Sequence, residues 1–227
     1  MILKKDNSFV ICLKPAGISS QSLPDGKDCM PKRLADCLEI PQENIYTLHR
    51  LDNPVGGTMV YATTKKGAAV LSGYIADGTM QKTYLAVIRG VPENKEGVYE
   101  DLLFKDSTKN KSFVVKRMRK GVRKASLEYK VLGTLTHEDE QYSLVQILLH
   151  TGRTHQIRVQ FSSRKLPLAG DRRYGSGNDG MPLGLWCMTL AFPDPSSNGD
   201  IVSMSATPST EQYPWCLFKE IIPQINT

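Results

Sequence analysis

The sequence predicts an α+β fold with a mainly antiparallel sheet, for two reasons. Short β-rich apolar runs recur along the chain, and two pairs of them are joined by turn-forming residues, within 125–149 and 185–205. Helical spacing of apolar residues is confined to a few segments, so we expect helices to flank the sheet. With 227 residues and 40% hydrophobic content the chain can bury a full core, and we expect one domain over residues 1–227.

The first 90 residues are expected to hold four strands and two helices. β-branched and apolar residues cluster in four runs that predict strands, at 8–14, 44–48, 58–62 and 81–90. A short helix is predicted between Pro31 and Pro41. A second helix is predicted from a cap at Thr63 or Thr64 to a stop near Gly78.

The rest of the chain is expected to hold two hairpins and two further helices. Residues 91–112 are predicted to form connecting strands and loops, and the hairpin within 125–149 is predicted to turn at the acidic residues 138–140. Thr154 is a candidate cap for a short helix. After the second hairpin, a run with the spacing of an amphipathic helix is expected to close the fold, with apolar residues Trp215, Leu217, Phe218, Ile221 and Ile222.

The basic residues are clustered. The chain carries 29 Lys and Arg against 23 Asp and Glu, a net charge of +6. Residues 105–124 contain nine basic residues and one acidic residue, Asp106. Such a run is typical of a solvated loop, but nine like charges repel one another and a phosphate-bearing partner would offset the repulsion. The run is therefore either a solvated loop or a surface for nucleic acid.

Several classes of protein are not indicated. The five cysteines are odd in number and include no C-x-x-C pair, so neither a disulfide framework nor a zinc site is expected and reduced thiols fit best. The N-terminus lacks the apolar stretch of a secretory signal, and no window approaches a membrane span. The sequence holds no Gly-rich phosphate loop and no set of metal ligands. We expect a cytoplasmic protein without metal, nucleotide cofactor or membrane contact.

Three stretches carry residues suited to chemistry. In an extended segment Arg50 and Asp52 project the same way while Leu51 faces the core, and two glycines then let the chain turn. Tyr84 lies on a predicted strand, and Arg158 about one turn into a predicted helix, where anions are favoured. Alone, these features are also typical of a surface ion pair, a half-buried strand tyrosine and a solvated helix face. Together they leave open a cofactor-free chemistry at a glycosidic centre.

Spaced motifs follow one another along most of the chain, from about residue 9 to residue 192. They are Lys14-Pro15-Ala16-Gly17, His49-Arg50-Leu51-Asp52 with Gly57, Lys82-Thr83-Tyr84-Leu85-Ala86-Val87 with Gly90, Gly152-Arg153-Thr154-His155-Gln156-Ile157-Arg158, and Gly170-Asp171 with Tyr174-Gly175. Their order resembles that of the RluA-type RNA pseudouridine synthases. The resemblance implies a central mixed, mainly antiparallel sheet with flanking helices and loops. It also implies that uridine in RNA is isomerised to pseudouridine by cleaving the base from the sugar, rotating it and rejoining it through a ring carbon.

By this resemblance Asp52 is the catalytic carboxylate, acting on the sugar or base directly or removing a sugar proton to give a glycal. Tyr84 would pack on the target uracil and help to remove the ring proton. Arg158 would pair with Asp52 and keep it ionised, because an opposite charge nearby favours the charged form. Arg50 would fill the gap left when the uridine is flipped out of its stack.

The predicted RNA contacts come from the motifs and from the basic run. They are His49, Arg50, Arg153 and His155 in the motifs, and Lys116, Arg117, Arg119 and Lys120 in the run. The RNA is expected to be rRNA or tRNA, and the protein to be a monomer. No separate N-terminal RNA-binding domain is expected, because the catalytic fold already includes Phe9.

One departure from the family leaves alternatives open. Val55-Gly56 stands where the family usually has Thr-Ser, which removes two hydroxyls next to the catalytic loop, and Thr58 is a candidate substitute for them. An RNA-binding or RNA-folding protein with weak or lost catalysis is therefore the alternative function. A small-molecule glycosidase is a third hypothesis, in which Asp171 would be the second carboxylate.

Overall fold

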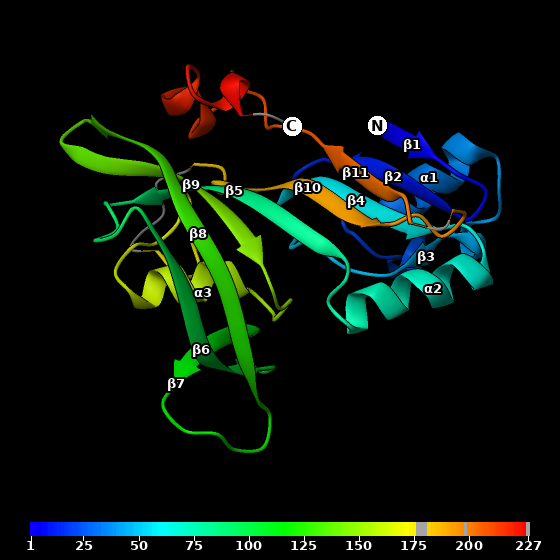
Figure 1. Cartoon of the computed structure of the whole chain (residues 1–227), viewed down its shortest axis with the longest axis horizontal. Helices are drawn as coiled ribbons and strands as arrows, with labels where there is room; N and C mark the ends of the chain where they lie inside the picture. The colour runs from blue at the N-terminus through cyan, green and yellow to red at the C-terminus, as the bar shows by residue number, and fades with distance from the viewer. Residues whose placement is uncertain (176–180, 198, 226–227) are drawn as a thin grey trace. The chain divides into compact units, whose positions relative to one another are not determined.

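The computed structural model describes residues 1–175, 181–197 and 199–225. Within these residues the chain forms three α-helices and eleven strands, which confirms the predicted α+β class (Figure 1). The chain divides into two compact units, each built from separate segments. Among the described residues, the first unit comprises Met1–Lys82 and Trp186–Pro208, and the second comprises Thr83–Leu185 and residues 209–225. The prediction of one domain over residues 1–227 stays a prediction.

The first unit holds the mixed part of the sheet. Its strands lie in the order β1 (Ile2–Lys5), β2 (Phe9–Lys14), β4 (Gly56–Ala62), β10 (Leu185–Pro193) and β11 (Ile201–Ser205), and β3 (Tyr46–Thr47) also pairs with β4. All neighbours are antiparallel except β4 and β10, which run parallel with Gly56 opposite Trp186. Every residue of β4 is buried, so this strand is the centre of the unit. The predicted hairpin within 185–205 is confirmed as β10 and β11.

Two helices belong to the first unit, together with the short 3₁₀ turns η1 (Pro24–Gly26) and η2 (Gln42–Asn44). The predicted start of α2 (Lys65–Ala76) is confirmed, because the Thr64 hydroxyl accepts a hydrogen bond from the Gly67 N–H at 3.0 Å. Helix α1 (Met30–Leu38) has Pro31 in its first turn, as predicted. None of the helices in the described part of the chain is long and apolar enough to cross a membrane.

The second unit is antiparallel throughout. Its strands lie in the order β5 (Gln81–Arg89), β9 (Glu140–Leu149), β8 (Val122–His137), β6 (Glu96–Asp106) and β7 (Lys111–Val115). The predicted hairpin of β8 and β9 is confirmed and is longer than expected. Helix α3 (Gln156–Ser163) packs against β6 and β7 (Figure 1), and its Val159 meets Leu103 and Ala125 in a buried cluster.

Two predictions about helices in this unit are wrong. Thr154 does not cap α3: the helix begins after His155, whose φ of 54° is left-handed, and no side chain caps it. The closing amphipathic helix is instead two 3₁₀ turns, η3 (Trp215–Phe218) and η4 (Ile222–Gln224). Pro223 cannot donate a backbone hydrogen bond and clashes with the preceding turn, so a longer α-helix cannot form there. The apolar spacing did mark buried side chains, since Phe218 and Ile222 are among the core residues.

Candidate active site

The loop that carries Asp52, residues 48–55, joins β3 to β4 and has a fixed backbone. The Ser20 hydroxyl donates to the Leu51 carbonyl at 2.8 Å and accepts from the Leu51 N–H at 3.1 Å. The Gly17 N–H donates to the Asn53 carbonyl at 2.8 Å. Both donors come from the segment after β2, so two loops far apart in sequence hold one another in place.

The predicted alternation of side chains in this loop is found. Leu51 is buried, whereas Arg50 is exposed and Asp52 is half-buried. The Val55 N–H donates to the Asp52 carbonyl at 2.9 Å, which closes a tight turn directly after the carboxylate. Arg50 reaches the Gln21 side chain, with Nη1 and Oε1 3.3 Å apart. The loop thus presents an arginine and a carboxylate while Leu51 anchors it in the core.

Lys14, the last residue of β2, contacts this loop and is the main residue that sequence reasoning missed. Its side chain is fully buried, and Nζ donates to the carbonyl oxygens of Pro15 at 2.9 Å, Ile18 at 2.7 Å and Asn53 at 3.2 Å. Burial lowers the pKa of Lys14 to about 8, although the negative charge of Asp52 opposes the shift. A lysine that ends a buried strand was the available signal, because such a cation must find acceptors inside the protein.

His49 lies inside the protein. The residue is 9% exposed, and Nε2 accepts a hydrogen bond from the Val60 N–H at 3.2 Å. Burial, helped by the positive charge of Lys82, lowers the pKa of His49 well below its ordinary value, so the ring is neutral. Among the described residues Nδ1 has no hydrogen-bond partner. A buried neutral imidazole offers no cation to a phosphate, so its placement favours a role in holding β4 over the predicted RNA contact.

Gly56 and Gly57 are the first two residues of strand β4, and they do not form the predicted turn. A Cβ atom at Gly56 would overlap the indole ring of Trp186, 2.8 Å from its Cε3 atom. Gly57 has a φ of 125° and lies against the backbone of Cys187. Thr58 does not substitute for the missing hydroxyls, because its Oγ1 donates to the Cys187 carbonyl at 3.1 Å inside the sheet. Trp186 therefore occupies the space that a side chain at position 56 would need.

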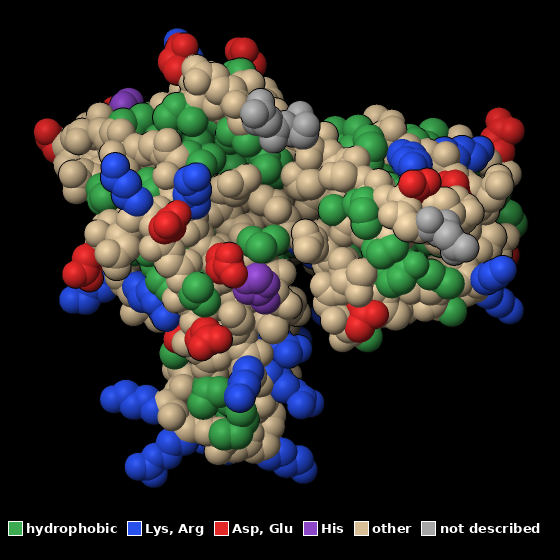
Figure 2. All heavy atoms as spheres, in the orientation of Figure 1, with side chains coloured by type: hydrophobic (Ala, Val, Ile, Leu, Met, Phe, Trp, Pro, Cys, Tyr) green, Lys and Arg blue, Asp and Glu red, His purple; other side chains and the backbone are tan. Residues whose placement is uncertain are grey.

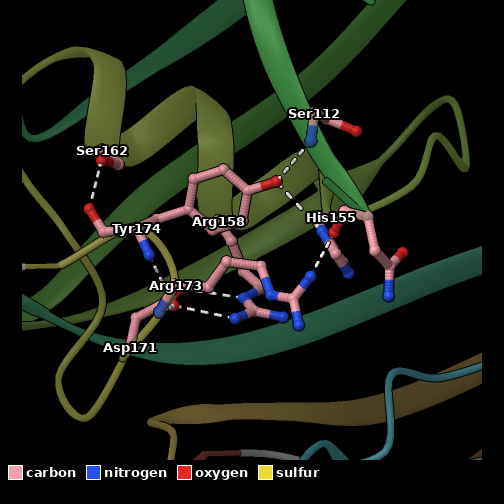
Figure 3. A network of polar contacts seen from close by, with 8 residues as sticks. Ser112, His155, Arg158, Ser162, Asp171, Arg173 and Tyr174 are labelled. Carbon is pink, nitrogen blue, oxygen red and sulfur yellow. Dashed lines mark hydrogen bonds and ion pairs between the residues drawn. The ribbon is translucent and has the colours of Figure 1, made fainter. Parts of the chain in front are cut away.

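Arg158 in the first turn of α3 forms a buried ion pair with Asp171 (Figure 3). Nε and Nη2 each lie 2.8 Å from a carboxylate oxygen, and the exposed fractions of the two residues are 6% and 3%. Asp171 also accepts from the backbone N–H groups of Arg173 and Tyr174, both at 3.0 Å. Burial alone would raise the pKa of Asp171, but the hydrogen bonds and charge of Arg158 hold it below its usual value. The guanidinium is thereby fixed in one plane.

Tyr174 connects this ion pair to strand β7. Its hydroxyl accepts from the Ser112 N–H at 2.7 Å and lies 3.0 Å from Nδ1 of His155 (Figure 3). The Arg158 guanidinium carbon lies 5.3 Å from the centre of the tyrosine ring. His155, predicted to contact RNA, is half-buried within this network. Sequence reasoning noted Tyr174 as a motif residue without predicting this role.

The basic run consists of strands joined by exposed loops, so a solvated loop describes only part of it, and its contact with nucleic acid stays a prediction. We call residues 105–124 the basic arm; it comprises the end of β6, all of β7, a loop and the start of β8. The loop side chains predicted to contact RNA are all exposed, namely Lys116, Arg117, Arg119 and Lys120. Arg153 is also exposed, and its Nε donates to the Lys124 carbonyl at 3.0 Å, which holds it beside the arm.

The three predicted catalytic residues belong to different units. Asp52 lies in the first unit, and Tyr84 and Arg158 lie in the second. Tyr84 is buried on β5, opposite Ile147 of β9. The action of all three on one substrate stays a prediction.

Comparison with known proteins identifies the family. The family model described as RNA pseudouridylate synthase matches residues 8–163. A Bacillus subtilis protein named as an uncharacterized RNA pseudouridine synthase is 33% identical over 180 residues, 78% of this chain and 58% of its own. A tRNA pseudouridine synthase C of Vibrio parahaemolyticus is 28% identical over 237 residues, 96% of this chain and 94% of its own.

A solved human structure, RNA pseudouridylate synthase domain containing 4, shares the fold. Its TM-score is 0.75 at 22% identity, and the match covers 98% of this chain and 92% of the human one. The chain spans 58% of the Bacillus relative, so less than two thirds of that protein is represented. The family model covers well over half of this chain, and relatives named as tRNA and ribosomal pseudouridine synthases match it. The chain therefore belongs to the RNA pseudouridylate synthase family, and the resemblance to RluA-type members is confirmed.

Proposed function

We propose that this chain isomerises specific uridines in structured RNA to pseudouridine, with Asp52 as the catalytic carboxylate. The observation that supports this most directly is the construction of the loop around Asp52. Its backbone is held by Ser20, Gly17 and Lys14, while the Asp52 residue itself is half-buried. A rigid loop that presents one carboxylate is preorganised for attack at a sugar or base, or for removal of a sugar proton.

Tyr84 and Arg158 are proposed to act on the same uridine. Tyr84 would pack against the uracil and assist removal of the ring proton, and its burial on β5 supports a fixed ring. Arg158 would keep Asp52 ionised and oriented. The ion pair with Asp171 supports this, because it commits Nε and Nη2 and so fixes the direction of Nη1.

RNA is proposed to bind through exposed cations of both units. Arg50 is the candidate to fill the gap of the flipped uridine, at a cost of roughly a few kcal/mol for flipping. Arg153 and the basic arm would hold phosphates. The Vibrio relative is named for tRNA, and a Buchnera aphidicola relative, 31% identical over 178 residues, for the large ribosomal subunit. These two RNA classes are the substrates to test first.

Two other functions receive less support. In the glycosidase hypothesis Asp171 would act as a general acid, but its carboxylate is bound by Arg158 and its pKa lies below the usual value, so it has no proton to donate near neutral pH. The hypothesis of an RNA-binding protein with lost catalysis depended on the missing hydroxyls at Val55 and Gly56. Trp186 fills the space at position 56, which favours an altered but intact loop.

Tritium release from RNA that carries ring-tritiated uridine tests the proposal. Total RNA from cells lacking this protein is the substrate, and Asp52→Asn is the catalytic variant. Asp36→Asn, which changes an exposed carboxylate on α1, is the matched control. We expect release with the wild type and with the control, and none with Asp52→Asn although its RNA affinity is nearly unchanged. No release by the wild type above the Asp52→Asn background would refute the enzyme and leave an RNA-binding protein.

A further inference from the structure

The basic arm has an outer face that turns away from helix α3. Leu103 of β6 packs against Val159 of α3, so its neighbour Phe104 projects to the opposite side of the sheet. Phe104 lies opposite Phe113 on β7 and opposite Val122 on β8. Three apolar side chains therefore form a row across three strands. We call this surface the outer face; Met118 lies in the loop that joins β7 to β8 at the end of the same arm.

Part of the outer face is open to solvent. Phe113 is 37% exposed and Met118 is 55% exposed, both large for apolar side chains. Cations lie near the aromatic rings. The Arg119 guanidinium carbon lies 5.0 Å from the centre of Phe104. Lys111 Nζ lies 5.9 Å from the centre of Phe113 and 4.9 Å from that of Tyr174. Apolar and cationic groups are thus interleaved on one surface.

The charge around this surface is mainly positive. Figure 2 shows hydrophobic side chains at the end of the arm, bordered by Lys and Arg side chains. The arm carries nine basic residues, and its single acidic residue, Asp106, accepts hydrogen bonds from the backbone N–H groups of Thr108 and Lys109. Asp106 therefore closes a turn. A surface of this charge favours a polyanion as its partner.

We propose that the outer face is a stacking platform for an unpaired segment of RNA. One or two bases would stack on Phe113 and Met118 while the surrounding cations hold the flanking phosphates. A surface that reads only the phosphates of a duplex gains nothing from exposed apolar side chains, because paired bases keep their faces stacked on one another. The inference rests on the proposed function, since it takes RNA as the substrate, and it adds the single-stranded character of the bound segment.

Fluorescence anisotropy with two labelled probes tests the platform, using a short unpaired RNA and a duplex of the same length. The test variant is Phe113→Thr/Met118→Ser. The control is Val98→Ser, because Val98 is 58% exposed on the same face of β6 but lies about 20 Å along the strand, beside Glu128 and away from the arm. We expect the test variant to bind the unpaired RNA roughly tenfold or more weakly, with duplex binding unchanged. The control should bind both probes as the wild type does.

Salt dependence separates stacking from phosphate contact. The stacking variant should keep the wild-type slope of log affinity against log salt, because it loses no phosphate contact. The variant Arg117→Ala/Arg119→Ala/Lys120→Ala loses phosphate contacts, so its slope should be shallower than that of the wild type by roughly 2. If Phe113→Thr unfolds the protein, Met118→Ser alone replaces the double variant, because Met118 lies in an exposed loop. Phe113→Trp keeps an aromatic ring and should retain the affinity for the unpaired RNA.

Several results would overturn the platform. They are equal loss for both probes, no loss for the unpaired probe, or self-association of the wild type that the stacking variant abolishes, since the face would then be an interface between copies. Binding is measured without turnover, so failure of the platform is distinct from failure of tritium release. If the wild type releases tritium and the stacking variant binds the unpaired RNA as tightly as the wild type, the platform is refuted and the proposed function stands.

Discussion

Replacing Lys14 by methionine tests whether a buried ammonium fixes the catalytic loop. The substitution keeps the length of the side chain and removes its charge and its three donors. Lys14 is fully buried, and its Nζ donates to the Pro15 and Ile18 carbonyls and, together with the Gly17 N–H, to the Asn53 carbonyl of the loop that carries Asp52. The variant should therefore affect both the stability of the first unit and the position of Asp52.

The expected loss of stability follows from two opposing effects. Hydrogen bonds to a charged group contribute about 1.5–3 kcal/mol each, so three contribute about 5–9 kcal/mol. The methionine variant is also freed of the cost of burying an ammonium, which offsets part of this loss. Burial lowers the pKa of Lys14 from 10.5 to about 8, which corresponds to a cost of about 3 kcal/mol. We expect Lys14→Met to lower the free energy of unfolding by about 2–6 kcal/mol.

Urea denaturation measures this loss, and tritium release measures turnover of the folded enzyme. The control is Lys32→Met, which removes a solvent-exposed lysine of α1 that donates to the Gly26 carbonyl at 3.1 Å. The control should change stability by less than about 0.5 kcal/mol. Lys14→Met should lower kcat more than it changes KM, because the loop loses one of its three anchors while the RNA contacts stay.

The pH dependence gives the same reasoning a second, independent check. Because the folded pKa of Lys14 is lowered, the unfolded chain binds more protons than the folded one between about pH 8 and the ordinary lysine value. Wild-type stability should therefore receive a rising contribution across that window, while turnover falls as the ammonium loses a donor. The methionine variant should show neither effect. Wild-type stability and an unchanged pH profile in Lys14→Met would refute the assigned role.

Two further substitutions test the packing around the site. Gly56→Ser should destabilise the protein by about 1–3 kcal/mol, because its Cβ would overlap the Trp186 ring, and Trp186→Leu should restore part of the loss in the double variant. Thermal unfolding measures both, with Gly73→Ser as the control, since that glycine has open space around it, and equal effects at positions 56 and 73 would contradict the packing. Asp171→Asn should cost about 3–5 kcal/mol, because it leaves the buried Arg158 guanidinium without its counter-charge. Urea denaturation checks this, and a variant as stable as the wild type would show that the ion pair is dispensable.

The sequence predicted local elements well where one residue type determines the outcome. The Thr64 cap of α2 and the proline in the first turn of α1 were predictable from hydrogen-bonding and backbone constraints. The start of α3 was not, because His155 adopts a left-handed backbone that its residue type does not demand. The C-terminal run has helical spacing, yet Pro223 limits it to short turns.

The partners of the site residues were the harder part to predict. Arg158 and Asp171 are 13 residues apart, and their pairing depends on how α3 packs against the loop that follows it. The Asn53 carbonyl likewise reaches Lys14, 39 residues away in sequence, only once β2 and β4 have paired. Contacts of this kind depend on the register of strands, and a single sequence carries no direct record of register.

The contacts that hold the loop carrying Asp52 help to explain why it can have Val55 and Gly56 where the family usually has Thr and Ser. Every contact from Ser20, Gly17 and Lys14 to the loop ends on a backbone atom, of Leu51 or of Asn53. Backbone anchors do not depend on the side chains at positions 55 and 56, so the loss of two hydroxyls there leaves all of them in place. The position that did change is covered by Trp186, from a strand about 130 residues later that runs parallel to β4. A motif residue is therefore best judged together with its neighbour across the sheet. On that basis we expect the change at positions 55 and 56 to repack the loop and to leave the Asp52 carboxylate in place.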